Sequence, residues 1–311
     1  MISRKILIDL KDAVWGNNKF EFNRSALSSW TYPLNLNFTL ENEGAYFFPK
    51  DERGVPIRMY KSVGPQYNPT RIATYALAHF NCYLTYRHDI NKRIFMDMAE
   101  WFMQSRDGLW QYHFDWDTLR APWISAMAQG EGISVLSRAY WLTQEDRFLE
   151  QALLASKPFS SSINDGGVRS RISGKWDFVE EYPSPDPYHT LNGFLFALVG
   201  ICDLLRISSE RREMIGFDPL VETLERNSHL WDLSYWSAYD LHNFGTWQRN
   251  PATVSYHRLH IALLTYLGHA LEKENILRTA RLWESYSTSM SKRIKALAVK
   301  ILYRLEYAPS R

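Results

Sequence analysis

Apolar residues recur at helical spacing over most of the chain from residue 69 onward. Apolar positions three or four residues apart are typical of helices that bury one face. Pro69 and Pro122 open two such segments, and the first position of a helix is a favoured place for proline. We therefore predict a mainly α-helical fold. The predicted helical segments are 69–86, 93–104, 122–142, 146–159, 190–207, 217–233, 255–272 and 276–307.

The predicted helices alternate in character. Those that start near residues 69, 122, 190 and 255 are apolar on most sides, and each successor carries a charged face. A helix that is apolar all round is buried, and a helix with a polar stripe lies outside. This alternation predicts an (α/α) toroid or barrel of about four helical hairpins, although no sequence repeat accompanies it.

The first 62 residues have a different pattern, rich in turn residues. LNLNFTL at 34–40 alternates between apolar and polar positions, as a strand does. We predict two parts: an N-terminal wrapping segment with short strands (1–62) and an (α/α) barrel catalytic domain (63–311).

Four long loops lead from an outer helix to the next inner helix, and all are dense in Tyr, Trp, His, Arg and carboxylates. In a barrel of hairpins they open at one end, and rich loops on a rigid scaffold usually carry function. The opposite connections, such as 143–145 and 272–275, are short. A simpler interpretation is that the aromatic residues only cap the barrel. The four loops are 62–69, 110–123, 176–190 and 239–257.

Composition narrows the possible partners. The net charge is only +2 and the basic residues are scattered, so we expect no nucleic-acid partner. The chain has 12 Trp, 18 Tyr and 16 Phe, and aromatic faces suit the apolar C–H groups of sugars. No apolar run is long enough for a membrane span or a signal peptide, so we expect a cytoplasmic protein.

The loops contain candidate acids and bases. Glu180 and Glu181 precede Tyr182-Pro183, and they are either an acid/base source or a solvated surface pair. Tyr239 and Tyr256 lie on the fourth loop, and a tyrosine acts as a base only when nearby cations lower its pKa. The candidates for that field are His242, Arg249, His257 and Arg258.

A metal site is a weaker hypothesis. His257 and His260 stand three residues apart near a helix start, with His242 nearby, but no Asp, Glu or Cys joins them at ligand spacing. We therefore expect no metal. The P-loop, G-x-G-x-x-G, H-E-x-x-H and G-x-S-x-G motifs are absent from the sequence.

Three blocks of sequence resemble the C-terminal domain of D-glucuronyl C5-epimerases, in the order found in that family. The first is PWISAMAQGEGISVLSRAYWLT (122–143) followed by FLEQALLASKPF. The second is VEEYPSPDPYHTLNGFLFALVGICDLL (179–205), and the third is AYDLHNFG followed by SYHRLHIALL within 238–263. GPQYNPTRIATYALAHF (64–80) is a fainter match.

The resemblance implies an (α/α) barrel that acts on a heparosan- or heparan-like polysaccharide, an acidic polymer. The implied reaction removes the C5 proton of D-glucuronate and returns one to the opposite face, which gives L-iduronate without a cofactor. The implied catalytic residues are Glu181, Tyr182, Tyr239 and Tyr256. The candidate substrate-binding residues are Gln66, Tyr67, His113, Arg120, Trp123, Gln129, Arg169, Asn192, His242, Arg249, His257, Arg258 and His260.

The chain differs from the family pattern at two cationic positions. His242 follows Leu241 where the family has an arginine, and Thr253 to Ser255 replace another arginine shortly before the Tyr-His pair. Arg249 is the nearest substitute. These differences concern the groups that would hold an acidic polymer.

Other functions remain open at this point. A polysaccharide lyase would share the C5 proton abstraction and then expel the 4-O substituent. A glycoside hydrolase would pair Glu181 with Asp115 or Asp240. A non-catalytic protein would only bind the uronate polymer. A homodimer is a further option, because the basic C-terminal helix can pack either on the barrel or on a partner.

Overall fold

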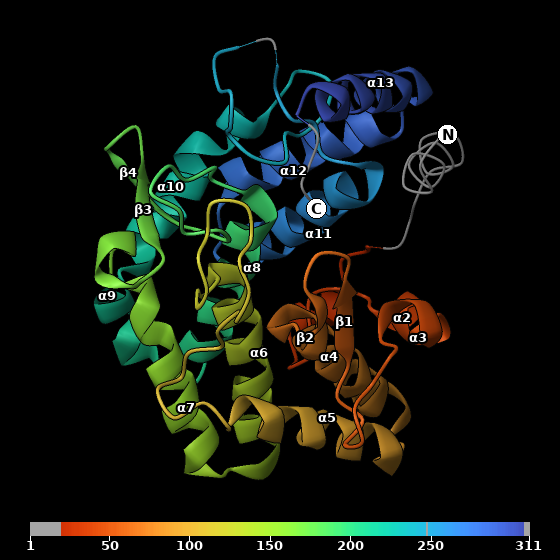
Figure 1. The fold of residues 1–311 in the computed structure, drawn as a ribbon, viewed down its shortest axis with the longest axis vertical. Helices are drawn as coiled ribbons and strands as arrows, with labels where there is room; N and C mark the ends of the chain where they lie inside the picture. The colour runs from red at the N-terminus through yellow and green to blue at the C-terminus, as the bar shows by residue number, and fades with distance from the viewer. Residues whose placement is uncertain (1–19, 247, 308–311) are drawn as a thin grey trace.

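The computed structural model describes residues 20–246 and 248–307, which are mainly α-helical (Figure 1). The predicted mainly α fold class is therefore confirmed. The longer helices are α4 (Pro69–Tyr86), α5 (Asp89–Phe102), α6 (Ala126–Thr143), α7 (Asp146–Ser156), α8 (Leu191–Leu205), α10 (Phe217–Asn227), α11 (Val254–Ala270), α12 (Glu274–Ser287) and α13 (Met290–Glu306). The short helices are α2 (Asn37–Glu41), α3 (Glu43–Tyr46) and α9 (Arg212–Ile215).

Two small antiparallel sheets lie outside the helical body. Strand β1 (Ile57–Tyr60) pairs with β2 (Gly64–Tyr67), and β3 (Arg169–Ile172) pairs with β4 (Trp176–Val179). Each pair is a hairpin that leads into one of the predicted rich loops. Short 3-10 turns complete the described elements: η1 (Arg24–Leu27), η2 (Lys157–Phe159), η3 (Ile163–Asp165), η4 (Ser209–Arg211) and η5 (Ser228–Trp231).

The inner helices pack in chain order. Helix α4 contacts α6, α6 contacts α8, and α8 contacts α11, while α5, α7 and α12 each pack on the helix that precedes them. Helices α6 and α8 approach most closely through two glycines, because a Cβ on Gly200 would lie 2.1 Å from the carbonyl oxygen of Gly130. The inner and outer alternation read from the sequence is thus present, and closure of these helices into a toroid stays a prediction.

Several helix boundaries differ from the prediction: α5 begins at Asp89 rather than at residue 93, and α10 ends at Asn227 rather than at residue 233. Helix α6 begins at Ala126 rather than at Pro122, because Tyr112 and Trp123 exchange two backbone hydrogen bonds that keep the preceding chain extended. The predicted segment 276–307 is two helices, α12 and α13. Ser289 separates them, and its hydroxyl accepts the backbone N–H of Lys292 as an N-cap.

The strand predicted at 34–40 is wrong. Leu34 makes an isolated bridge to Phe22, but the chain is helical from Asn37. The Asn35 side chain accepts the backbone N–H of Asn37, and such local side-chain bonds favour turns over extended backbone. The first 19 residues of the predicted wrapping segment lie outside the described residues, and its division from the barrel at residue 62 stays a prediction.

Residues 20–36 of the N-terminal segment pack against the C-terminal halves of the inner helices, whereas Lys50 contacts Tyr75 in the first half of α4. The backbone N–H of Tyr32 donates to Asn81 of α4 at 2.8 Å, and Asn81 donates to the Leu34 carbonyl at 3.1 Å. Arg138 of α6 donates from Nε to the Trp30 carbonyl at 2.9 Å. The segment therefore joins α4 and α6 at the end opposite to the rich loops.

A buried ion pair lies under this segment. Arg138 of α6 contacts Asp203 of α8 at 2.5 Å, and the two side chains are 1% and 0% exposed. Ser134 donates to the same Asp203 oxygen at 2.7 Å. Arg138 also lies over the ring of Tyr32. Both charged groups of the pair have partners, as a buried ion pair requires, whereas the buried Tyr32 hydroxyl has none among the described residues.

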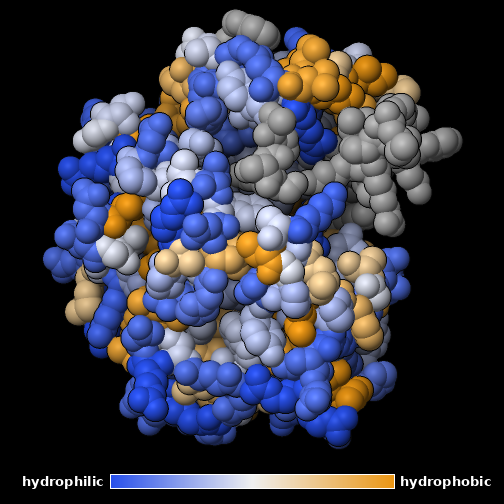
Figure 2. Space-filling view, in the orientation of Figure 1, coloured by the Kyte–Doolittle hydropathy of each residue, from blue (hydrophilic) through white to orange (hydrophobic). Residues whose placement is uncertain are grey.

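Helix α13 lies on the outside of the molecule. Met290, Ile294, Leu302 and Leu305 are exposed on it, and an apolar patch is visible at α13 in the space-filling view (Figure 2). Association through this helix stays a prediction. Within residues 20–246 and 248–307, every helix is too short or too polar to cross a bilayer.

Candidate active site

Three of the four rich loops meet around one small cavity. Its volume is about 80 Å³, and it lies beside the N-terminal ends of α4, α6 and α8. Loops 62–69, 110–123 and 176–190, with the hairpin strand before the first of them, supply most of its lining. We call this space the Glu181 cavity; its lining residues are Tyr60, Asn68, Thr70, Tyr112, Phe114, Trp116, Trp123, Ser125, Met127, Glu181 and Tyr182.

The adjacent glutamates of the third loop point to different partners. They follow strand β4, and successive side chains of an extended chain face opposite sides. Glu180 accepts from Ser170 and lies 2.6 Å from Nδ1 of His189. Glu181 accepts from Nδ2 of Asn192 at 2.9 Å. The side chains are buried, with residue exposures of 1% and 7%, so the interpretation as a solvated surface pair is wrong.

Gly193 in the first turn of α8 allows Glu181 to reach this position. A Cβ on Gly193 would lie 2.4 Å from the Cβ of Glu181, closer than two carbon atoms can approach. The glycine therefore lets the glutamate pack directly on the helix start. The N-terminus of a helix carries partial positive charge, which favours a carboxylate there. This is a physical role for the Leu-Asn-Gly sequence that follows the prolines.

Sequence reasoning missed a second buried acid, Glu131 of α6. It is 2% exposed, and its Oε2 has no hydrogen-bond partner among the described residues. Burial, and then the charge of Glu181, raise the pKa of Glu131 well above its ordinary value. Burial, Tyr60, Glu131 and Glu181 likewise raise the pKa of the Tyr112 phenol. The only sequence signal for Glu131 was one acid between two glycines of an apolar helix.

The unsatisfied groups point to a site rather than to packing. Besides Oε2 of Glu131, Oδ1 of Asn192 is buried without a partner among the residues described. Buried polar atoms are nearly always hydrogen-bonded, so such exceptions need an explanation. Both atoms belong to residues that interact with Glu181. A ligand that offers hydrogen-bond donors and acceptors is one explanation.

The fourth loop brings two tyrosines together on the other side of the α8 start. The rings of Tyr239 and Tyr256 lie 5.1 Å apart, edge to face at 75°. The backbone N–H of Leu191 donates to the Tyr239 carbonyl at 3.0 Å, which ties the loop to α8. Thr253 caps α11 by accepting the N–H of Tyr256. Tyr239 is 8% exposed and Tyr256 is 38% exposed.

Asp240 and Lys300 surround this tyrosine pair. Asp240 is buried and accepts from Asn250 at 2.6 Å. Burial raises the pKa of Asp240 to about 6, against the opposing effects of that hydrogen bond, Lys300 and His242. Lys300 of α13 donates to Asn250 at 2.5 Å, and its Nζ lies 5.6 Å from the centre of the Tyr239 ring. Helix α13 therefore places a cation beside Tyr239.

The predicted arginine contacts are largely committed to other partners. Arg249 donates to the Leu230 carbonyl at 2.7 Å, and Arg258 pairs with Glu284 at 2.7 Å. Arg120 pairs with Asp115 on the surface. Arg169 donates to the carbonyl oxygens of Phe159, Ile215 and Gly216 and pairs with Asp177.

Three other predicted binding residues are fully buried. His257 stacks on Trp236 at 3.7 Å and bonds with Ser237, which also contacts His260 at 3.0 Å. Burial lowers both histidine pKa values, that of His260 to about 3. Gln129 donates to two carbonyl oxygens in the core. We leave these three residues out of the site proposed below because none of them lines the Glu181 cavity, although Nε2 of His260 is also buried without a partner among the described residues.

The remaining predicted residues lie near the loop end. Trp123 lines the Glu181 cavity and stacks on Tyr112 at 4.2 Å. His242 packs on the ring of Tyr188 at 4.4 Å. Gln66, Tyr67 and His113 line a separate groove, which is taken up below.

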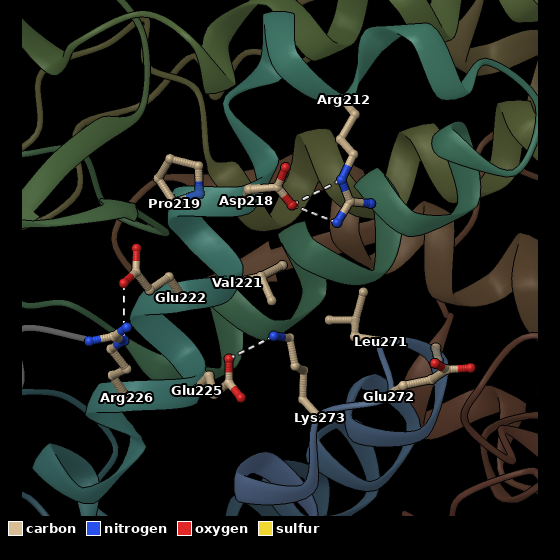
Figure 3. A pocket seen from close by; sticks show the side chains of 11 residues that line it. Arg212, Asp218, Pro219, Val221, Glu222, Glu225, Arg226, Leu271, Glu272 and Lys273 are labelled. Atoms are coloured by element: carbon tan, nitrogen blue, oxygen red, sulfur yellow. Dashed lines mark hydrogen bonds and ion pairs between the residues drawn. The ribbon is translucent and has the colours of Figure 1, made fainter.

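A larger surface groove, of about 630 Å³, lies between α10 and the turn after α11 (Figure 3). Its charged side chains form ion pairs with one another, and the figure shows three of them, of which Lys273–Glu225 joins α10 to the turn after α11. None of the predicted site residues lines it. We therefore do not place the reaction there. The three pairs are Arg212–Asp218, Arg226–Glu222 and Lys273–Glu225.

The fold and site describe an all-α protein with a buried carboxylate and tyrosines grouped at one helix start. A family model described as "D-glucuronyl C5-epimerase C-terminus" matches residues 104–285. The chain is 31% identical to the D-glucuronyl C5-epimerase of Caenorhabditis elegans over 230 residues, which is 66% of this chain and 36% of that protein. The chain therefore belongs to the D-glucuronyl C5-epimerase C-terminus family, as the resemblance predicted.

A second relative is an uncharacterised protein of Methanocaldococcus jannaschii, 26% identical over 137 residues. That match covers 42% of this chain and 44% of the archaeal protein. The chain thus aligns with only about a third of the worm enzyme and under half of the archaeal protein. The family match contains Glu131, Glu181, Tyr182, Tyr239 and Tyr256, whereas Lys300 lies outside it.

Proposed function

We propose that this chain inverts C5 of D-glucuronate residues within a heparosan- or heparan-like polysaccharide and so forms L-iduronate. Family membership supports the reaction class. The observation that carries the assignment to residues is the grouping at the start of α8. Glu181 contacts Asn192 on one side, and the Tyr239 carbonyl contacts Leu191 on the other.

The reaction needs a base and an acid on opposite faces of one sugar ring. A tyrosinate on one face takes the C5 proton, and the C–H electron pair passes into the C5–C6 bond and onto the uronate carboxylate. A tyrosine on the other face then donates a proton to C5, and the carboxylate regains its original form. We assign these two roles to Tyr182 and to the Tyr239–Tyr256 pair. Only a proton moves, so the proposed step needs no cofactor.

Developing negative charge on the uronate carboxylate must be stabilised. Three groups of this site favour such charge: the N-terminus of α8, Lys300 beside Tyr239, and Glu131, whose raised pKa keeps a proton on it over a wider pH range. In this proposal Glu181 is the carboxylate that accepts a proton from, or orients, the hydroxyl of Tyr182.

Incubation with heparosan in D₂O tests the proposal. We expect NMR to show deuterium at C5 together with iduronate signals. The matched control is the Tyr182→Phe, Tyr256→Phe double variant, which keeps both rings and should incorporate no deuterium. An unsaturated uronate that absorbs in the ultraviolet would show a lyase instead. Binding without deuterium incorporation would show a non-catalytic protein.

A further inference from the structure

A second groove lies next to the Glu181 cavity, and the reaction does not use it. Its volume is about 560 Å³, within the size range of small-molecule sites. It lies between β2, the end of α5 and the loop that follows. Residues that line it and bear on the argument are Arg53, Tyr67, Trp101, Gln104, Arg106 and Gln111.

One extended segment separates the groove from the cavity. Gln111 and His113 line the groove, whereas Tyr112 and Phe114 line the Glu181 cavity. This alternation follows from the backbone pairing of Tyr112 with Trp123, because side chains of an extended chain point to opposite faces in turn. The two spaces therefore lie on the two faces of a single segment and adjoin each other.

The groove lining combines ring faces with uncommitted polar groups. The rings of Tyr67 and Trp101 lie 6.0 Å apart. Among the described residues, the side chains of Gln104, Arg106 and Gln111 make no hydrogen bond or ion pair, although each lines the groove. Ordinary surface packing does not require two glutamines and an arginine to converge on a pair of aromatic rings.

The charge of the groove favours an acidic ligand. Arg53 and Arg106 contribute two positive charges, and Asp107 contributes one negative charge. The Asp107 carboxylate already accepts from Ser105 and from the Leu109 N–H, and the Ser105 bond is the main cause that lowers its pKa. Arg53 lies 3.6 Å from Asp51, which also accepts from the Tyr67 hydroxyl, so Arg106 is the lining cation without an ion-pair partner among the described residues.

We propose that this groove is a binding subsite for uronate-containing sugar units next to the reacting one. Tyr67 and Trp101 stack on the sugar faces, Gln104 and Gln111 bind hydroxyl or amide groups, and Arg53 and Arg106 bind the carboxylates. The proposal rests on the proposed function for the identity of the polymer. Arg53, Tyr67 and Trp101 lie before the family match, so this subsite extends the shared site with residues of the chain's own N-terminal third.

Heparosan oligosaccharides of increasing length test the subsite. Calorimetry would measure the affinity of the wild type, of the Gln104→Ala, Arg106→Ala double variant, and of Arg278→Ala, which removes an exposed arginine from α12. We expect the wild type to bind a decasaccharide more tightly than a tetrasaccharide. The double variant should bind the decasaccharide at least about tenfold more weakly than the wild type, since it loses a charge-assisted bond, and should bind the tetrasaccharide within about twofold of it.

C5 deuterium exchange, measured on the same samples, separates this inference from the proposed function. Equal length dependence in the double variant and the wild type would overturn the subsite, whatever the exchange shows. Length-dependent binding that the double variant loses, without any C5 exchange, would support the subsite and overturn the proposed reaction. If the wild type binds none of the oligosaccharides, both the subsite and the proposed reaction are overturned. Arg278→Ala should match the wild type throughout.

Discussion

Helices α6 and α8 each carry a buried polar cluster at both ends, and the two clusters follow opposite rules. At the end covered by the N-terminal segment, Arg138 and Asp203 form an ion pair in which the contacts are satisfied. At the loop end, Glu131 and Glu181 are two acids of like charge, and Oε2 of Glu131 has no partner among the described residues. Helix α6 thus pairs with an opposite charge of α8 near one end, and with the like charge of Glu181, in the loop before α8, near the other.

This difference separates structure from function. A satisfied ion pair holds elements together, and its removal leaves an unpaired charge. Like charges with unsatisfied atoms cost stability, so proteins keep them chiefly where they serve a site. Glu131 and Arg138 are two turns apart on α6, so burial alone does not distinguish them. Their partners do.

The largest expected effect is on the satisfied cluster. Asp203→Ala leaves Arg138 as a buried cation without its partner, and we expect the free energy of unfolding to fall by ~3–5 kcal/mol. Urea denaturation followed by tryptophan fluorescence measures it. Replacing both residues together, Arg138→Met with Asp203→Leu, should cost much less. A loss below ~1 kcal/mol for Asp203→Ala would show that the pair is not needed for folding.

At the loop end we expect the reverse, a loss of activity with little change in stability. Tyr182→Phe and Tyr256→Phe each keep the ring and remove the hydroxyl, and should lower C5 inversion by ~10²–10⁴-fold. Tyr86→Phe, which changes an exposed tyrosine at the far end of α4, is the control. NMR of iduronate formation measures the rate. Full activity in both variants would remove these tyrosines from the mechanism.

Gly193→Ala should affect both stability and activity. The new Cβ would lie 2.4 Å from the Glu181 Cβ, so the glutamate must move. We expect a stability loss of ~1–3 kcal/mol, typical of overpacking, and a slower reaction. Gly44→Ala is the control, because a Cβ there meets nothing within 4 Å. Unchanged activity in Gly193→Ala would show that the exact position of Glu181 does not matter.

The smallest effect concerns pH. The folded-state pKa of Glu131 is raised, so its contribution to stability is fully present below its unfolded pKa of about 4.3 and is lost as pH rises through the folded value. Glu131→Gln keeps the shape and removes this loss, so the variant should gain stability relative to the wild type as pH rises. Urea midpoints from about pH 4 to about pH 9 measure the gain. Parallel pH profiles would contradict it.

The sequence predicted the helices well because the burial of a helix face repeats within one segment. It failed at 34–40, where alternation resembled a strand while the side chain of Asn35 stabilised a turn. The paired glutamates were recognised, but the sequence did not show that their side chains bind different partners. Glu180 binds Ser170 and His189, and Glu181 binds Asn192. Roles that depend on contacts between elements leave little periodic signal.

Glu131 and Lys300 show the same limit. Glu131 was hidden in an apolar helix, and its importance arises from Glu181, 50 positions later in the sequence. Lys300 was one of several basic residues on an amphipathic C-terminal segment. The chain breaks at Ser289, and the new helix α13 places Lys300 beside the Tyr239 ring. The four residues that the resemblance implied as catalytic were named from the sequence, and their catalytic roles stay a prediction that the variants above test.

The hydrogen bond from Arg138 to the Trp30 carbonyl bears on how this family can be divided and recombined. The family match, residues 104–285, includes Arg138 and Asp203 but excludes Trp30, Asn81 and all of α4. The matched stretch is therefore smaller than the set of elements that pack together around this ion pair. A chimaera with junctions at residues 104 and 285 would carry Glu131 and Glu181 but would lack the contacts that Trp30 and α4 make with α6. Junctions that keep these contacts lie before the segment that contains Trp30.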